Sequence, residues 1–238
     1  MAKTILITGS SRGIGASLAI LAKKEGYNVI LHGKSYSKNL RLISKKLKSQ
    51  YLFFDLNNDQ EMQQAIKSIK KIDILINSVG INISKTFTNL TLEDWRSVYD
   101  CNIFGVVNLI RSIMPILNKP PFPVKIINIA SVKGTYSAVG HAAYASSKAA
   151  LINLTTALAK EFSPNILVNS VSPGFISTEM TKKTWSKRIK KQVDTILLKR
   201  IAKPEEIANV ILFLCSDKCT YMTGQNIIVD GGFGIKHE

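Results

Sequence analysis

The glycine-rich segment at residues 8–15 limits the possible folds of this chain more than any other feature. Residues 3–8, just before it, form a short β-branched run that is typical of a buried parallel strand. After it, apolar residues recur every three to four positions until Gly26, which predicts a helix near residues 13–25. Glycines at such a junction let the backbone approach a pyrophosphate at the helix N-terminus. The segment therefore predicts a dinucleotide-binding turn, although its spacing, Gly-x3-Gly-x-Gly, is not the commoner one and an ordinary tight turn is the alternative.

Strand-like and helix-like patterns alternate along the rest of the chain. Strands are predicted near residues 3–8, 27–32, 51–54, 73–77, 124–130, 166–172 and 226–229. Helices are predicted near residues 13–25, 37–49, 59–70, 92–117, 142–163, 181–198 and 204–215. We therefore expect a single domain, residues 1–238, with a doubly wound, Rossmann-type α/β fold: a seven-stranded parallel sheet with helices on both faces.

Composition and cysteine content indicate a globular protein of a reducing compartment. Hydrophobic residues make up 45% of the chain, and the longest apolar stretch, residues 103–117, is interrupted by Asn108 and Arg111 and is too short to span a bilayer. A strand pattern begins within three residues of the N-terminus, so no secretory signal is expected. The three cysteines argue against a disulfide framework, and no cluster of metal ligands accompanies them. We expect a cytoplasmic protein without a metal site.

The chain carries a formal net charge of +16, and its basic residues are clustered. Residues 34–48 hold six basic side chains and no acidic one, and residues 182–203 hold nine, opposed only by Asp194. These clusters are either a solvated lysine-rich surface or sites that attract anions. The first cluster follows the second predicted strand, where an adenosine ribose would lie. The second belongs to a helical segment near 181–203 that we expect to cover the mouth of a substrate site.

A second motif is formed by Ser131, Tyr144 and Lys148. Tyr144 and Lys148 are four residues apart in the helix predicted at 142–163, so both lie on one helix face. Ser131 follows the strand predicted at 124–130, at the end where doubly wound sheets bind ligands. A phenol has a pKa of about 10, and a nearby ammonium favours its ionised form. Each residue alone has an ordinary alternative, as a turn residue, a packed ring or a surface charge; together with the glycine-rich segment they predict a nicotinamide-dependent redox enzyme.

Motifs in matching order along almost the whole chain resemble the short-chain dehydrogenase/reductase family. They are residues 8–15, Asp55-Leu56, Asn77-Ser78-Val79-Gly80, Asn102, Ser131, Tyr144 with Lys148, Pro173-Gly174 and residues 223–232. Within the family, residues 169–180 and 200–208 are most similar to 3-oxoacyl-(acyl-carrier-protein) reductases. The resemblance implies the same α/β fold, a nicotinamide cofactor and a homotetramer of two-fold symmetry.

The chain departs from the family pattern in two places. Residues 77–80 read Asn-Ser-Val-Gly instead of Asn-Asn-Ala-Gly, with the first and last residues of the motif retained. Residues 162–165 lack the basic residue that carrier-protein reductases often have before the sixth strand. Docking of an acidic carrier would then depend on Lys125, on Lys133 or on the cluster at 182–203.

The resemblance also implies a role for each of four catalytic residues. Tyr144 is expected to be the acid/base, and Ser131 is expected to hydrogen-bond the substrate oxygen. Lys148 is expected to bind the hydroxyls of the nicotinamide ribose. Asn102 is expected to hold a water that links Lys148 to solvent for proton transfer.

The residues after the second predicted strand bear on the choice of cofactor. Dehydrogenases that choose NAD usually have an acid there, but residues 32–35 read His-Gly-Lys-Ser. Arg12, with Lys34 or Ser35, would instead bind a 2′-phosphate, so we predict NADP(H). By resemblance, Asp55 and Leu56 flank the adenine, Asn77 and Gly80 lie on the ribose side, and residues 173–178 hold the carboxamide. The expected cofactor-binding residues are Gly9, Ser11, Arg12, Gly13, Ile14, Gly15, Lys34, Ser35, Asp55, Leu56, Asn77, Gly80, Tyr144, Lys148, Pro173, Gly174, Ile176 and Thr178.

Three interpretations of function remain open from the sequence. The leading one is an NADPH-dependent reductase of 3-oxoacyl thioesters, with an acyl carrier protein as partner. A second keeps the mechanism but acts on a sugar, a polyol or another secondary alcohol. A third is a non-catalytic cofactor sensor or a nucleic-acid-binding protein, which rests on charge alone because no nucleic-acid-binding module is recognised. We expect no nucleic acid and no membrane among the partners.

Overall fold

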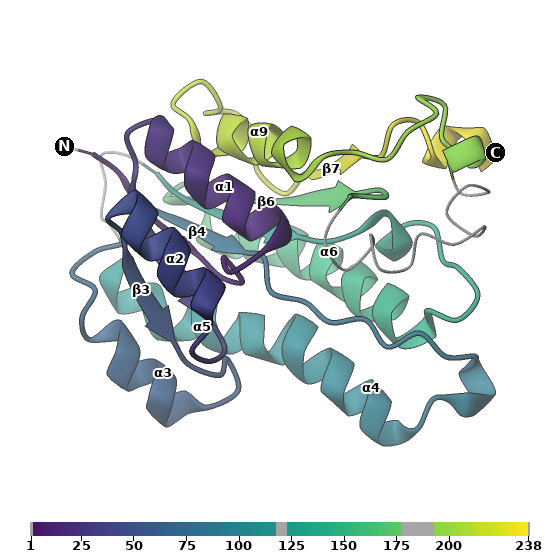
Figure 1. The fold of residues 1–238 in the computed structure, drawn as a ribbon, viewed down its shortest axis with the longest axis horizontal. Helices are drawn as coiled ribbons and strands as arrows, with labels where there is room; N and C mark the ends of the chain where they lie inside the picture. Colours follow the sequence, from purple (N-terminus) through teal and green to yellow (C-terminus); the bar gives the residue numbers. More distant parts are fainter. Residues whose placement is uncertain (1, 118–122, 178–192, 238) are drawn as a thin grey trace.

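The computed structural model describes residues 2–117, 123–177 and 193–237, and its centre is one parallel sheet (Figure 1). The strands are β1 (Thr4–Ile7), β2 (Asn28–Gly33), β3 (Gln50–Phe53), β4 (Ile74–Asn77), β5 (Val124–Ile129), β6 (Ile166–Pro173) and β7 (Asn226–Val229). Their order across the seven-stranded sheet is β3-β2-β1-β4-β5-β6-β7, and every neighbouring pair is parallel. The doubly wound α/β fold predicted from the strand and helix patterns is therefore confirmed.

The helices lie in two layers, one on each face of the sheet (Figure 1). They are α1 (Gly13–Lys24), α2 (Lys38–Leu47), α3 (Asp59–Ile66), α4 (Leu92–Tyr99), α5 (Gly105–Ile113), α6 (Ala142–Phe162) and α9 (Pro204–Cys215). Successive side chains of a strand point to opposite faces, so Ile5 and Ile7 of β1 pack in the core beneath α1, α2 and α9. Leu6, between them, packs in the other core, with α3, α5 and α6. Both faces are covered, which explains why the strands read as continuous apolar runs.

The helix predicted at residues 92–117 is interrupted. It consists of α4, a π-helical turn at Asp100–Phe104, α5 and a 3₁₀ turn at Met114–Ile116. A π-turn inserts one residue into the helix, and apolar spacing does not show such an insertion. At the break, a Cβ on Gly105 would lie 2.8 Å from Leu56 Cβ, so the backbone approaches its neighbour closely. The π-turn contains Asn102 and holds it in the interior.

The helix predicted at 181–198 lies mostly outside the described residues. Of its described part, residues 193–195 are helical, residue 196 is a bend and residues 197–198 form a turn, so the helix ends before the predicted limit. Within the described ranges, no helix is both long and apolar enough to cross a membrane. The described residues also contain no group of three or more potential metal ligands.

Candidate active site

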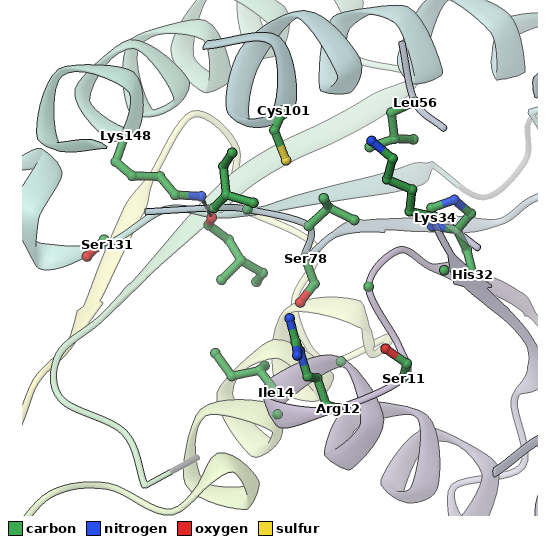
Figure 2. A pocket seen from close by; sticks show the side chains of 18 of the residues that line it. Ser11, Arg12, Ile14, His32, Lys34, Leu56, Ser78, Cys101, Ser131 and Lys148 are labelled. Carbon is green, nitrogen blue, oxygen red and sulfur yellow. Dashed lines mark hydrogen bonds between the residues drawn. The ribbon is translucent and has the colours of Figure 1, made fainter. Parts of the chain in front are cut away.

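A cleft of about 1280 Å³ opens at the carboxyl ends of the central strands (Figure 2). It receives residues that follow β1, β2, β3, β4, β5 and β6, where the chain turns to one face of the sheet or the other. This is the position at which open parallel sheets bind ligands. Ser131 and Lys148 lie at one end of the cleft, and Ser11, Arg12 and Lys34 lie toward the other (Figure 2).

The glycine-rich segment forms one wall of the cleft. Gly9 and Gly13 have φ values of +64° and +58°, which favour glycine, and a Cβ on Gly15 would lie 2.5 Å from Gly9 O. Ser10 attaches the segment to β2, because its backbone N–H donates to His32 O at 2.9 Å and its Oγ accepts from His32 N at 2.8 Å. The N-terminus of α1 therefore faces the cleft with N–H groups that have no partner within the helix, and these fit a pyrophosphate.

Ser131, Tyr144 and Lys148 all line the same end of the cleft. Ser131 follows β5, where its Oγ accepts a hydrogen bond from Lys133 N at 3.2 Å, and its hydroxyl is near enough to Tyr144 to affect the pKa of the phenol. Lys148 is buried; its Nζ lies 5.9 Å from the centre of the Tyr144 ring and donates to Ile129 O at 2.8 Å. The predicted convergence of the three side chains is present. Ser131 is also the first residue of a turn, as the alternative interpretation of this residue predicted. The turn and the position at the cleft are compatible.

Burial controls the protonation of both Tyr144 and Lys148. It raises the pKa of Tyr144, against a smaller lowering by the neighbouring Ser131 hydroxyl. It lowers the pKa of Lys148 to about 8. The expectation that Lys148 favours a phenolate is therefore not met in this structure. At neutral pH Tyr144 is a neutral phenol that can donate a proton to an oxygen, as reduction of a carbonyl requires.

Asn102 supports the cleft from behind and does not line it. Its Oδ1 accepts from Ile81 N at 2.9 Å, and its Nδ2 donates to Ile81 O at 3.0 Å and to Ser147 Oγ at 2.9 Å. Because both amide protons are used, a water held by Asn102 would have to donate to its oxygens. A Cβ on Gly80 would lie 3.1 Å from Lys148 Nζ and 3.3 Å from Asn102 Oδ1, so glycine lets these groups approach each other.

Ser147 is a site residue that the sequence analysis did not identify. Its Oγ accepts from Asn102 and donates to Tyr144 O at 2.7 Å, so it joins the π-turn to α6 between Tyr144 and Lys148. The one available signal was its position next to Lys148. A serine inside a helix usually bonds its own backbone, as Ser146 does here.

The adenosine end of the cleft contains the expected residues and one unexpected contact. Arg12, Ser35 and Leu56 line it, and Arg12 is exposed at the start of α1. Lys34 Nζ forms an ion pair with Asp55 Oδ2 at 2.7 Å. Lys34 was predicted as a phosphate ligand and Asp55 as a neighbour of adenine, and no local pattern in the sequence indicates that they pair.

Of the expected cofactor-binding residues that the structure describes, Asn77 does not line the cleft. Asn77 is buried beneath it, where its Nδ2 donates to Asn128 Oδ1 at 2.8 Å, and Asn128 Nδ2 donates to Thr155 Oγ1 at 2.9 Å. Its side chain turns into the sheet and connects β4, β5 and α6, so only its backbone could serve the ribose side, and that placement stays a prediction. Thr178 lies outside the described residues. The other carboxamide-segment residues, Pro173, Gly174 and Ile176, line the cleft.

Lys125 cannot contribute to carrier docking. It is buried within β5, and its Nζ donates to Ser216 O and to Cys219 O at the end of α9. The alternation of side chains along a strand predicts which face of the sheet a residue lies on, but it does not show that Lys125 reaches the carbonyls of a distant segment. The other described candidate, Lys133, has its Nζ 2.7 Å from His141 Nε2.

Comparisons with known proteins agree with this geometry. The model of a family described as "Enoyl-(Acyl carrier protein) reductase" matches residues 9–234. A 3-oxoacyl-[acyl-carrier-protein] reductase of Thermotoga maritima is 38% identical over 98% of this chain and 98% of its own length. The enzyme of the same name from Aquifex aeolicus is 36% identical over 97% of this chain and 96% of its own.

A solved structure gives the same result for the fold. It is a short-chain dehydrogenase/reductase from Brucella melitensis, titled glucose/ribitol dehydrogenase, with a TM-score of 0.90 and 31% sequence identity. The alignment covers 97% of this chain and 96% of that one. With the glycine-rich turn and the Ser131, Tyr144 and Lys148 constellation in place, the chain belongs to the short-chain dehydrogenase/reductase family of oxidoreductases.

Proposed function

We propose that the protein is an NADPH-dependent reductase that converts the ketone of a 3-oxoacyl thioester, carried on an acyl carrier protein, to a hydroxyl group. The observation that carries the proposal is the convergence of Ser131, Tyr144 and Lys148 in the same cleft as the glycine-rich turn. The names of the relatives from Thermotoga maritima and Aquifex aeolicus support the substrate class.

The reaction needs one proton donor and one polarising group at the ketone oxygen. A nicotinamide held in this cleft would supply the hydride that the carbonyl carbon needs. Ser131 Oγ and the Tyr144 hydroxyl hydrogen-bond the oxygen, and Tyr144 gives it a proton as negative charge develops there. Lys148 Nζ has three protons and donates one hydrogen bond within the described part of the chain, to Ile129 O. Its other protons serve the ribose hydroxyls and the proton supply of Tyr144.

The preference for NADPH follows from charge at the adenosine end. No carboxylate stands at the end of β2, and Arg12 and Lys34 line that part of the cleft. A 2′-phosphate is bound well by cationic donors of this kind. Comparable dissociation constants for NADPH and NADH would contradict this part of the proposal.

The carrier and the assembly are part of the same proposal. With Lys125 buried, an acidic carrier would contact Lys133 and the basic residues near the mouth, of which Lys199, Arg200 and Lys203 are described and exposed. We propose that the protein is cytoplasmic. We also propose that it is a homotetramer, because large apolar side chains on the outer helices and the edge strand are exposed. They include Leu92 (75%), Phe104 (58%), Phe213 (47%) and Ile228 (40%). Light scattering after size exclusion measures the assembly directly.

The central experiment is NADPH oxidation across a substrate panel. The panel contains 3-oxoacyl thioesters, enoyl thioesters, small ketones and a keto sugar, assayed with the wild type, Tyr144→Phe and Tyr221→Phe. Tyr221 is fully exposed and away from the cleft, so its variant is the matched control. We expect turnover of 3-oxoacyl thioesters, its loss by about 10³-fold in Tyr144→Phe, and no change in Tyr221→Phe. Preference for enoyl thioesters or keto sugars, or full activity in Tyr144→Phe, would overturn the proposal.

A further inference from the structure

The ion pair between Lys34 and Asp55 is built by the register of the sheet. Gly33 of β2 is paired with Phe53 of β3, and Phe54 N donates to Gly33 O at 3.2 Å. The chain leaves the two strands side by side, so Lys34 and Asp55 meet just beyond their ends, with Nζ and Oδ2 2.7 Å apart. Figure 2 shows the Lys34 side chain extending toward Leu56, the residue after Asp55.

Both partners are ionised at neutral pH and both line the cofactor cleft. The hydrogen bond to Asp55 raises the pKa of Lys34. Burial tends to raise the pKa of Asp55, but the hydrogen bonds from Lys34 and from Asn57 N lower it overall. A carboxylate is therefore present at the adenosine end, supplied by the end of β3 and not by the end of β2.

We propose that Asp55 is a specificity-determining residue: its carboxylate opposes binding of a 2′-phosphate, and Lys34 preserves the NADPH preference by neutralising that carboxylate as well as by contacting the phosphate. This inference rests on the proposed use of NADPH. A like charge near the phosphate disfavours it relative to a 2′-hydroxyl, whereas contacts of Asp55 with the adenosine are common to both cofactors. Asp55 therefore acts on the ratio of the two affinities.

The test is direct binding of both cofactors to four proteins: wild type, Lys34→Ala, Asp55→Asn and the double variant. Dissociation constants come from calorimetry without substrate, and the readout is the ratio Kd(NADH)/Kd(NADPH). Asparagine keeps the Oδ1 that accepts from Asn57 N at 3.1 Å, so the local turn is retained. Lys38→Ala is the control, because Lys38 is an exposed member of the same basic cluster that does not line the cleft.

We expect Lys34→Ala to lower the ratio about tenfold or more, because it removes one charge from the phosphate and leaves Asp55 uncompensated. Asp55→Asn should raise the ratio about threefold. The double variant should recover to within about threefold of wild type, since the uncompensated carboxylate is gone. These differences should shrink as salt is added, because the groups are solvent-accessible.

A ratio that Asp55→Asn leaves unchanged in both the wild-type and Lys34→Ala backgrounds would overturn the inference while leaving NADPH binding intact. A wild type that prefers NADH would overturn the proposed cofactor itself. The two failures are therefore distinguished by the wild-type ratio, measured first. A change of similar size in Lys38→Ala would show that general surface charge acts, and would also count against a specific role of Asp55.

Discussion

Two buried lysines at opposite ends of the sheet show what separates a functional cation from a structural one. Lys148 and Lys125 are 3% and 4% exposed, and burial lowers the pKa of both. Lys125 Nζ donates to Ser216 O, at the C-cap of α9, and to Cys219 O in the turn that follows, so its hydrogen bonds join β5 to the segment after that helix. Lys148 Nζ donates to one carbonyl, Ile129 O, and lines the cleft. Burial and a lowered pKa are therefore common to both, and unused donor capacity facing a cleft distinguishes Lys148.

The largest expected effect is that of Lys148→Met on turnover. Without the ammonium, the ribose contact and the proton supply of Tyr144 are lost, so kcat/KM should fall about 10³-fold. The melting temperature should stay close to that of wild type, because removal of a buried charge offsets the unsatisfied Ile129 O. Steady-state kinetics and thermal unfolding of one preparation measure both. Retention of activity with a large loss of stability would assign Lys148 the structural role instead.

The imidazole of His32 allows a test of whether burial alone lowers the pKa of a basic side chain at this end of the sheet. Its Nε2 lies 3.0 Å from Phe54 O, and burial lowers its pKa from 6.5 to about 4. The unfolded chain then binds the proton more tightly, so His32 makes folding less favourable as pH falls from 6.5 to 4. Compared with His32→Asn, the wild type should lose on the order of 3 kcal/mol of its free energy of unfolding when the pH is lowered to 4.

Urea unfolding of the wild type and of His32→Asn at several pH values checks this. A difference between the two proteins that does not change with pH would show that His32 titrates normally.

Lys125→Met should lower the stability of the protein and leave its cofactor binding intact, which is the opposite of the effect expected for Lys148→Met. Two carbonyls lose their donor at the end of α9, and the free energy of unfolding should fall by about 2 kcal/mol. For a chain of this size the melting temperature should drop by roughly 4–8 °C. The Kd for NADPH should change less than about twofold, because Lys125 lies away from the cleft. A strong loss of cofactor affinity would break the distinction between the two lysines.

The smallest effect is a decrease of the reductase activity at alkaline pH. Because the pKa of Lys148 is lowered to about 8, the ammonium is lost as pH rises above that value. The kcat/KM for NADPH reports the pKa of the enzyme before the cofactor binds, so it should decrease by about tenfold per pH unit above pH 8. Stability changes in the opposite sense: the folded pKa is below the unfolded value of 10.5, so the term from Lys148 favours folding more as pH rises from 8 to 10.5.

A pH–rate profile with Lys148→Arg as the control separates this decrease from general alkaline inactivation. Arginine stays charged, so whatever activity it retains should lack the decrease near pH 8.

The strands and most helices were predictable because each depends on a local pattern. All seven strands lie within two residues of their predicted limits, since a β-branched apolar run is recognisable by itself. Ser37 at the start of α2 and Thr91 at the start of α4 accept hydrogen bonds from Leu40 N and Asp94 N, as residues of these types do at helix N-termini. The π-turn at Asp100–Phe104 was missed, because it depends on the approach of Gly105 to Leu56 from another part of the chain.

By itself, the sequence determined the order of strands and helices, the glycine turn before α1 and the one-turn spacing of Tyr144 and Lys148, since periodicity and residue type are local properties. Only the tertiary structure decided that Lys148 faces the cleft while Lys125 binds carbonyls at and just after the C-cap of α9, that Asp55 pairs with Lys34, and that Tyr144 remains a neutral phenol. Burial and long-range contacts depend on residues from distant parts of the chain, so no short segment of the sequence shows them.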